Sequence, residues 1–273
     1  MKKELVVVVF IILITIGFSG CINVSNETPG PEVIEYFEDE YDASDDTILS
    51  VSTTNGEISI TTWDGEKITL NATKISRYGE DDLKNAEIIV TENGNEITIK
   101  VQHTQPIRSR AVDLDIKIPY NVKVESASTT NGPIQITNTM GNTVLTTTNG
   151  AINVEDVDGY VKATTTNGGI EIKGTTGIDD LNSENGGITA EIFDIQEDVD
   201  IECTNGCITL HIKPTINASI QISTSTGGIT VDDTFITVTE STYNSFKGTI
   251  GRGGNSINVV TINGDIKIDE LKI

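Results

Sequence analysis

Alternating apolar and polar residues dominate this chain, and the alternation recurs in register around an Asn-Gly dipeptide. Numbering each copy from its Asn as zero makes positions +3 and +5 apolar and position +4 polar, as in TTNGAINV at residues 147–154. Upstream, positions −6 and −4 are largely apolar and position −2 is small, usually Thr. Such alternation predicts strands with one buried and one solvent-facing side. Because Asn-Gly favours a positive-φ turn, each copy is expected to place a turn and then begin a strand.

The copies predict a series of structural turns with a short period. Successive turns lie 18 to 21 residues apart in the middle of the series and 37 or 38 apart towards its ends. Because the long steps are about twice the short ones, we interpret them as double coils whose middle turn has drifted or been interrupted. The predicted turn residues are Asn55, Asn93, Asn131, Asn149, Asn167, Asn185, Asn205 and Asn263, with a Thr226-Gly227 variant.

Two all-β architectures satisfy this pattern. One is a β-solenoid, or β-helix-like fold, in which coils of 18–21 residues stack so that equal positions form ladders. The alternative is a long antiparallel β-meander or sandwich, in which the Asn-Gly loops join hairpins. We favour the solenoid because in-register stacking requires near-identical turns at a fixed period. A weakly helical stretch at residues 79–87 is expected to be a surface excursion.

The N-terminal segment carries the signals of export. Residues 1–20 contain Lys2, Lys3 and an apolar run that is shorter than the ~20 residues of a membrane-spanning helix. This predicts a signal peptide, or alternatively an uncleaved N-terminal anchor helix. The tract Phe18-Ser19-Gly20-Cys21 resembles the lipobox of prokaryotic lipoproteins, which implies lipid attachment at Cys21. In either case the basic N-terminus stays inside and the remainder lies outside the membrane.

Composition divides the rest of the chain into two parts. Residues 21–46 are rich in acidic residues and are expected to form an extended, self-repelling tether. Tyr36, Phe37 and Tyr41 interrupt that tether, and they either dock onto the first coil or remain solvated. Residues 47–273 are predicted to form a single β-repeat domain.

Net charge argues against one class of partner. Forty-one acidic residues oppose 18 basic ones, which gives a formal charge of −23. A field of that sign repels nucleic acid, so we expect no nucleic-acid partner. We interpret the acidity as a solubility feature and infer no ligand from it.

The chain lacks the sequence motifs of common catalytic and metal sites. No nucleophile elbow, phosphate-binding loop or zinc-type cluster is present, so no catalytic residue, metal or cofactor is predicted. His103 and His211 each stand apart from other candidate ligands, and we interpret both as surface or edge residues. Asp156 and Asp158 resemble a calcium loop only in part and are interpreted as a solvated turn.

Two kinds of covalent modification are considered. Cys203 and Cys207 bracket one turn of an exported chain, so a disulfide between them is conceivable. Parity argues against it, because Cys203 occupies the inward position −2 whereas Cys207 is out of phase with the buried positions. We therefore expect two free thiols. Candidate N-glycosylation sequons occur at Asn23, Asn26, Asn71 and Asn217.

The repeats resemble a known family. The stretch VDLDIKIPYNVKVESASTTNGPIQI at 112–136, with Ile118-Pro119 between a strand and the Asn-Gly repeats, is similar to the putative-adhesin β-strand-repeat family of bacteria and archaea. The resemblance extends over residues 48–273. It implies a β-helix-like domain that is often membrane-tethered, with a surface or envelope-stress role. The family has no agreed catalytic residues, so none is transferred.

Together these features predict a non-enzymatic β-repeat protein on the extracellular face of the cell membrane, tethered through its N-terminal lipid or anchor helix. Its expected role is adhesion or surface interaction with an unidentified protein or glycan. A structural or regulatory envelope component, acting as a spacer or stress-sensor partner, is the alternative. A surface polysaccharide-active enzyme is a third hypothesis, which would require convergent carboxylates on one face.

Overall fold

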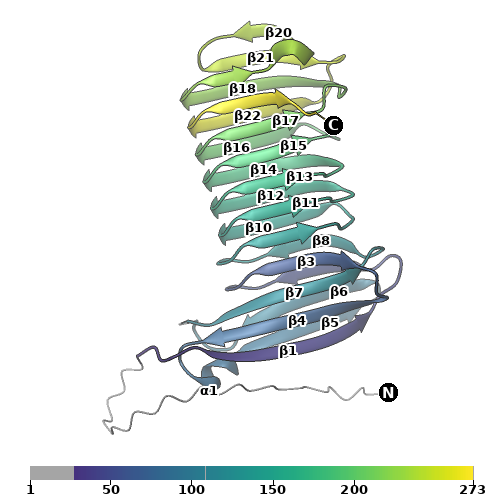
Figure 1. Cartoon of the computed structure of the whole chain (residues 1–273), viewed down its shortest axis with the longest axis vertical. Helices are drawn as coiled ribbons and strands as arrows, with labels where there is room; N and C mark the ends of the chain where they lie inside the picture. The colour runs from purple at the N-terminus through teal and green to yellow at the C-terminus, as the bar shows by residue number, and fades with distance from the viewer. Residues whose placement is uncertain (1–27, 108, 273) are drawn as a thin grey trace.

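The computed structural model describes residues 28–107 and 109–272 and shows an elongated β rod (Figure 1). Two long sheets face each other along the rod and enclose one continuous apolar core. We call the end that holds β1 (Val33–Asp42) the base and the end that holds β20 (Ile236–Ser241) the tip. A four-residue helix, α1 (Glu80–Leu83), lies at the base, and a 3-10 helix, η1 (Asp233–Phe235), lies at the tip.

Each sheet is a stack of short strands running across the rod. From base to tip, the first sheet contains β1, β4 (Lys67–Ser76), β7 (Ala111–Pro119), β3 (Ile58–Trp63), β9 (Ile134–Thr137), β11 (Ile152–Glu155), β13 (Ile170–Lys173), β15 (Ile188–Ile192), β17 (Ile208–Ile212), β23 (Ile266–Glu270) and β19 (Ile229–Val231). From base to tip, the second contains β5 (Ala86–Asn93), β6 (Glu96–His103), β2 (Ile48–Ser52), β8 (Lys123–Ser128), β10 (Thr143–Asn149), β12 (Tyr160–Asn167), β14 (Gly177–Asn185), β16 (Val199–Asn205), β22 (Ser256–Asn263), β18 (Ala218–Thr226), β21 (Ser245–Ile250) and β20.

The middle of the rod confirms the predicted solenoid. Neighbouring strands there are parallel and in register, so that Ile152 of β11 lies opposite Ile170 of β13. The second sheet repeats this arrangement, with Leu145 of β10 opposite Ala163 of β12. These side chains are buried, and each fully buried large aliphatic residue stabilises the fold by roughly 1.5–3 kcal/mol. The antiparallel meander is therefore excluded as the architecture of the repeats.

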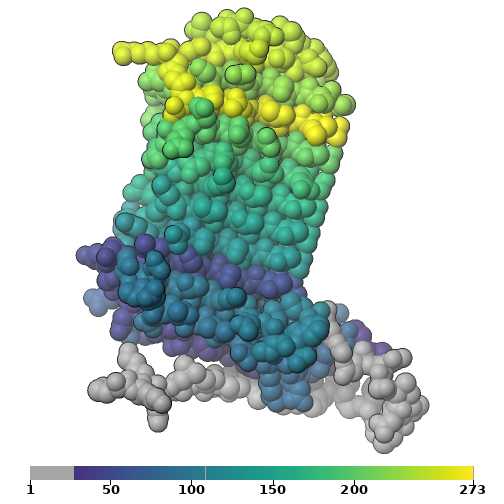
Figure 2. Space-filling view, turned by 180° about the vertical axis from the view of Figure 1, so that it is seen from behind, coloured from purple at the N-terminus to yellow at the C-terminus, as the bar shows by residue number. Residues whose placement is uncertain are grey.

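Chain order and spatial order differ at both ends of the rod. At the base, β2 pairs with both β6 and β8, so the β6–β7 coil lies outside the β2–β3 coil that precedes it in sequence. At the tip, β22 pairs with both β16 and β18. The C-terminal coil is thus inserted between two coils that precede it, and it appears as a yellow band below the yellow-green tip in Figure 2.

The interpretation of the long steps as double coils is therefore right only for the β6–β7 coil, whose corner has no Asn-Gly. The other residues between the distant turns form antiparallel excursions: β4 with β1 and β7, the β5–β6 hairpin, and the β20–β21 hairpin. An excursion uses about as many residues as one extra coil, so the spacing alone does not separate the two.

The turn at Asn93 is also corrected. Asn93 ends β5 and pairs with Glu96 across a two-residue hairpin loop, and the adjacent Gly94 has a φ of 65°. The two loop residues are Gly94 and Asn95, and a positive φ at the first of them alone is typical of a type II′ hairpin turn, in which glycine holds that position. Asn93 consequently lies outside the stack formed by the other turns.

The predicted tether is shortened by a strand. Val33–Asp42, within the segment 21–46, forms β1 and pairs over its whole length with β4. Phe37 and Tyr41 pack against the core, whereas Tyr36 is exposed on the opposite face. Pairing with β4 satisfies the backbone hydrogen-bonding groups along one edge of β1. Lys74 and Lys67 lie within ion-pair distance of Glu35 and Glu40, which offsets the acidic repulsion of the isolated segment.

Candidate functional site

The stacked corners between the two sheets form a regular surface feature, which we call the turn column. In each asparagine step of this column, one side-chain amide donates to the side-chain carbonyl of its neighbour. The donor–acceptor distances for these bonds lie between 2.5 and 3.0 Å. From base to tip, the column contains Asn55, Asn131, Asn149, Asn167, Asn185, Asn205, Asn263 and Thr226.

Glycine is required in this column for space rather than for an Asn-Gly hairpin. Corner asparagines have no positive φ among the described residues, where the non-glycine exceptions are Asn138 and Asp156. A Cβ on Gly150 would lie 1.9 Å from the carbonyl oxygen of Gly132. The neighbouring tiers repeat this close approach. Four glycines of the column have φ values between 135° and 157°: Gly56, Gly132, Gly186 and Gly227. A hairpin turn with positive φ at both Asn and Gly is nevertheless wrong for the column, because the chain turns a corner between sheets there.

The small residue at position −2 has a role that periodicity did not indicate. Its side chain donates a hydrogen bond to the glycine carbonyl of the adjacent tier, as Thr147 does to Gly132 at 3.0 Å. Because these side chains are buried, the bond satisfies a carbonyl that solvent does not reach. The donors are Thr129, Thr147, Thr165, Ser183, Cys203, Thr261 and Thr224.

The two cysteines of the repeat domain lie in different environments. Cys203 is buried and donates to the carbonyl oxygen of Gly186 at 3.1 Å, in place of the usual threonine. Burial raises the pKa of its thiol, which keeps the donor protonated. Cys207 is exposed, and both thiols are free in the structure. Their redox state in the cell stays a prediction, to be tested by thiol labelling.

The proposed modification sites are spread along the molecule. Cys21, Asn23 and Asn26 lie outside the described residues. Asn71 is half-buried on β4, and Asn217 is exposed before β18. The side-chain carbonyl of Asn217 accepts a hydrogen bond from the Arg252 backbone. Glycosylation at any of these asparagines stays a prediction.

The base encloses a polar network that the sequence did not indicate. Arg110 has a fully buried side chain that forms an ion pair with Asp82 of α1 and donates to Nδ1 of His103 at 3.3 Å. Ser76 donates to the same aspartate at 2.7 Å. The Nε2 atom of His103 is buried and has no hydrogen-bond partner within the described part of the chain. His103 is therefore a structural residue of the base, whereas His211 is partly exposed on β17.

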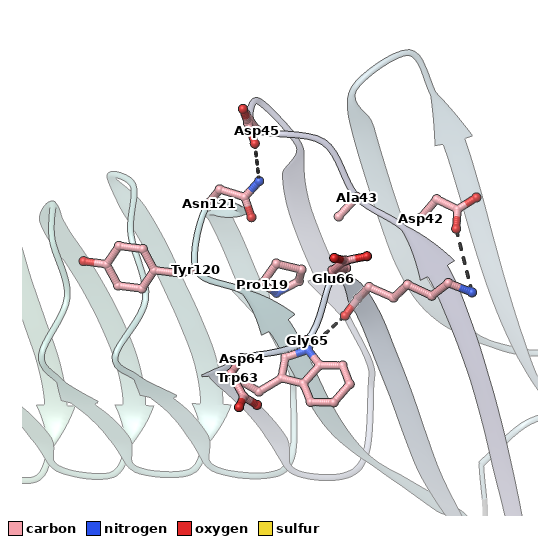
Figure 3. A pocket seen from close by; sticks show the side chains of 11 residues that line it. Asp42, Ala43, Asp45, Trp63, Asp64, Gly65, Glu66, Pro119, Tyr120 and Asn121 are labelled. Carbon is pink, nitrogen blue, oxygen red and sulfur yellow. Dashed lines mark hydrogen bonds and ion pairs between the residues drawn. The ribbon is translucent and has the colours of Figure 1, made fainter.

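An open hollow lies beside this base, where the ends of β1, β3 and β7 meet the start of β4 (Figure 3). Its volume is about 620 Å³. Trp63 and Pro119 are register partners in the parallel β3–β7 pair, which brings the loops that follow these two strands together. We define the hollow by its lining residues: Asp42, Ala43, Asp45, Trp63, Asp64, Gly65, Glu66, Lys67, Pro119, Tyr120 and Asn121.

Polar contacts organise the rim of the hollow. The Trp63 indole N–H donates to the backbone carbonyl of Lys67 at 2.9 Å. Asn121 donates to Asp45 at 2.7 Å, and the Lys67 ammonium lies 3.9 Å from a carboxylate oxygen of Asp42. Sequence reasoning missed this site, since its residues come from segments far apart in the chain. The single tryptophan, followed by Asp-Gly, was the local signal that could have indicated it.

Two further observations concern metal-binding clusters and membrane-spanning helices. Across residues 28–107 and 109–272, no cluster of three or more His, Cys, Asp or Glu side chains has a metal-binding arrangement. In the same residues, no helix combines the length and apolar character needed to cross a membrane.

Comparisons with known proteins agree with the observed architecture. Residues 107–269 match the Toastrack family, DUF4097. No curated protein matches the chain by sequence.

Several solved structures are similar over most of their length. A putative cell adhesion protein from Clostridium sporogenes has 13% identity and a TM-score of 0.39, with 87% of this chain and 99% of that chain covered. A putative adhesin from Bacteroides fragilis has 15% identity and a TM-score of 0.44, with coverages of 85% and 96%. A putative lipid binding protein from Parabacteroides distasonis has 12% identity and a TM-score of 0.32, with coverages of 87% and 97%. These likenesses are too distant to indicate a ligand or partner.

Proposed function

The chain belongs to the Toastrack family, DUF4097, and from this premise we propose that it is a non-enzymatic, membrane-tethered protein that mediates adhesion or another interaction at the cell surface. A lipid on Cys21, or an uncleaved anchor helix, would hold it at the extracellular face of the membrane. Its partner would be a protein or a glycan.

The placement of the two ends of the rod carries this proposal. The strand nearest the predicted lipid site, β1, lies at the base, and the β20–β21 hairpin lies at the opposite end (Figure 1). Twelve strands in the second sheet, spaced about 4.8 Å apart, give a rod roughly 50 Å long. An anchor before β1 would therefore leave the long faces and the tip free to meet partners.

The apolar core and the turn column suit such a role. Apolar side chains fill the space between the sheets from base to tip, while outward positions carry the polar residues. A continuous parallel stack resists bending, because its tiers share backbone hydrogen bonds and a close-packed core. We infer that the rod acts as a stiff display surface.

Fractionation of cells that express the full chain tests the tether and its orientation. We expect the protein in the membrane fraction, cleavable by protease added to intact cells, and released into the medium by Cys21→Ser if the lipid alone anchors it. Membrane retention of Cys21→Ser would favour the uncleaved anchor helix. A chain that stays inside intact cells, protected from protease, would overturn the proposal, and Cys207→Ser provides the matched cysteine control.

A polysaccharide-active enzyme is the second candidate, because Asp42, Asp45, Asp64 and Glu66 line one hollow. Glycosidases generally place two carboxyl groups about 5 to 10 Å apart on either side of the scissile bond. Asp45 already accepts from Asn121, and Asp42 already lies near Lys67. Release of reducing sugar from envelope polysaccharide by the wild-type chain, but not by Asp64→Asn/Glu66→Gln, would establish this candidate; we expect no release by either.

A further inference from the structure

One Asn-Gly dipeptide of the chain lies outside the turn column. Eight such dipeptides occur in the sequence, and seven of them belong to the column, from Asn55-Gly56 to Asn263-Gly264. The eighth, Asn93-Gly94, lies at the loop of the β5–β6 hairpin. The same dipeptide therefore occurs in two different environments within one molecule.

An asparagine that precedes a glycine is chemically labile. The glycine backbone nitrogen can attack the Cγ atom of the asparagine, because glycine has no Cβ to obstruct the approach. A bond forms between that nitrogen and Cγ, the bond from Cγ to Nδ2 breaks, and ammonia leaves with the proton of the attacking nitrogen. Water then opens the cyclic imide at either carbonyl and gives aspartate or isoaspartate. The net reaction consumes one water, releases one ammonia and changes no oxidation state.

The turn column restrains both of the groups that would react. Each of its Asn-Gly glycines donates its backbone N–H to a carbonyl of the next tier, at distances between 2.8 and 3.1 Å. The leaving amide is also held, as for Asn149, whose Nδ2 donates to Oδ1 of Asn131 at 2.7 Å. These glycines are buried or half-buried. Because the attacking nitrogen must lose its proton and turn towards its own side chain, the reaction in the column requires these bonds to break.

The Asn93-Gly94 pair lacks these restraints. Both residues are exposed, and neither the Asn93 side chain nor the Gly94 N–H has a hydrogen-bond partner among the described residues. The next asparagine shows the contrast, because Nδ2 of Asn95 donates to the Asp46 carbonyl at 2.8 Å and its own carbonyl accepts from Ile48. A Cβ on Gly94 would meet no atom of a more distant residue within 4 Å. The loop thus leaves the attacking nitrogen and the amide side chain free to meet.

We propose that Asn93 is a site of spontaneous deamidation in the folded protein, and that the turn column protects its own seven Asn-Gly asparagines from the same reaction. The product carries a new carboxylate at the end of β5, the outermost strand of the second sheet at the base. An isoaspartate also lengthens the main chain by one methylene where Asn93 pairs with Glu96. The inference goes beyond the surface role proposed above, and it does not depend on membrane tethering.

Mass spectrometry of the incubated protein tests this assignment. The full chain in mild detergent is kept folded in mildly alkaline buffer and digested at intervals under mildly acidic conditions. Each Asn-Gly peptide is then quantified in its amide, aspartate and isoaspartate forms. We expect Asn93 to react about tenfold or more faster than any column asparagine, because a column residue must first break two hydrogen bonds. Aspartate and isoaspartate should both accumulate at Asn93, as opening of a cyclic imide requires.

The unfolded chain and one variant provide the matched controls. In guanidinium chloride all eight Asn-Gly pairs should react at similar rates, because the bonds between tiers are lost. Asn93→Gln should suppress the release of ammonia from the folded protein, since the longer glutamine side chain cyclises slowly. Position 93 is exposed, so the circular dichroism of this variant should match that of the wild type.

Several results would overturn the proposal. One is a rate at Asn93 that does not exceed the rates of the column asparagines in the folded protein, and another is equal release of ammonia by the wild type and Asn93→Gln. The same preference for Asn93 in the unfolded chain would assign the reactivity to the flanking sequence instead of the fold. Formation of aspartate without isoaspartate would exclude the cyclic imide.

Discussion

At the scale of single residues, the turn column requires both the absence of a Cβ at its corner glycines and the presence of buried hydrogen-bond donors. Each corner glycine lies so close to the glycine carbonyl of the adjacent tier that a Cβ would collide with it. The residue two positions before the Asn donates a hydrogen bond to such a carbonyl. Neither requirement involves a ligand. The TTNG tract therefore recurs along the chain as a stacking unit, in which the first Thr, the Asn and the Gly have separate hydrogen-bonding or steric roles.

We expect Gly150→Ala to destabilise the rod by about 1–3 kcal/mol or more, because the new Cβ would collide with the Gly132 carbonyl. Gly169→Ala is the matched control, since its Cβ would lie 3.3 Å from the Gly187 carbonyl and Ala151 occupies the equivalent position one tier away. Urea unfolding followed by circular dichroism measures both effects. Equal midpoints for the two variants would contradict the steric explanation.

Cys203 offers a test of the buried donor. Its thiol is a weaker donor than a hydroxyl, so Cys203→Thr should stabilise the protein by about 0.5–1.5 kcal/mol. Cys203→Val, which leaves the Gly186 carbonyl without a donor, should lower the stability. The shift of the unfolding midpoint measures both, and Cys207→Ser controls for loss of an exposed thiol. Greater stability of the valine variant than of the threonine variant would refute this role.

At the scale of elements, different secondary-structure elements cap the two ends of the rod. The base uses β1, α1 and the loop before β7, joined by the ion pair of Arg110 with Asp82. The tip uses the antiparallel β20–β21 hairpin and η1. Both prevent the parallel stack from ending in an open apolar cross-section, as the terminal units of repeat proteins generally do.

The base should be sensitive to pH through His103. Burial and the nearby Arg110 charge lower the pKa of this histidine below its ordinary value, while Asp82 acts in the opposite direction. The folded state therefore binds fewer protons than the unfolded state below pH about 6.5. The contribution of neutral His103 to the free energy of unfolding is present above that pH. It is lost as the pH falls through the folded-state pKa of this histidine.

We accordingly expect the wild type to lose more stability than His103→Gln between pH about 7.5 and about 5. Hydrogen exchange of α1 and β6, with urea unfolding at each pH, measures the difference. His211→Gln is the control, because His211 lies on the outer face of β17, away from this network. Parallel pH profiles for the wild type and His103→Gln would show that other groups cause any acid sensitivity.

At the scale of the whole molecule, the charge of −23 is spread over a narrow rod. Repulsion among these groups opposes the compact state and is screened by salt, whose Debye length falls from about 30 Å at 0.01 M to about 3 Å at 1 M. The ion pairs at the surface are mostly exposed and contribute little individually. The salt dependence of stability shows whether the net repulsion or the ion pairs dominate.

Raising NaCl from about 10 mM to about 0.5 M should increase the thermal unfolding midpoint, because screening the net repulsion outweighs weakening the exposed pairs. Differential scanning calorimetry measures the midpoint, and choline chloride at the same ionic strength separates screening from specific sodium binding. A midpoint that falls with salt would mean that the ion pairs outweigh the net repulsion.

Particular residues show which structural features could be predicted from the sequence. The inward and outward residues of the middle coils, such as Ile152 and Asn153, followed from alternation alone. The turn at Asn93 did not, because the same dipeptide serves an antiparallel hairpin there and a corner between sheets elsewhere. Nor did the hollow, since Trp63 and Pro119 are brought side by side only by the pairing of β3 with β7. Local patterns encode which side of a strand is buried but not which distant strand lies beside it.

The sequence by itself therefore determined the all-β class, the period and the buried face of the repeat strands, and it favoured stacking of the middle turns over a meander. The tertiary structure alone decided that β1 joins the base, that the C-terminal coil lies between two earlier ones, and that an acidic, aromatic hollow exists. The physical reason is the separation along the chain over which each interaction acts. Alternation and turn chemistry act within a few residues, whereas the pairing of distant strands depends on chain closure and on which edge remains free.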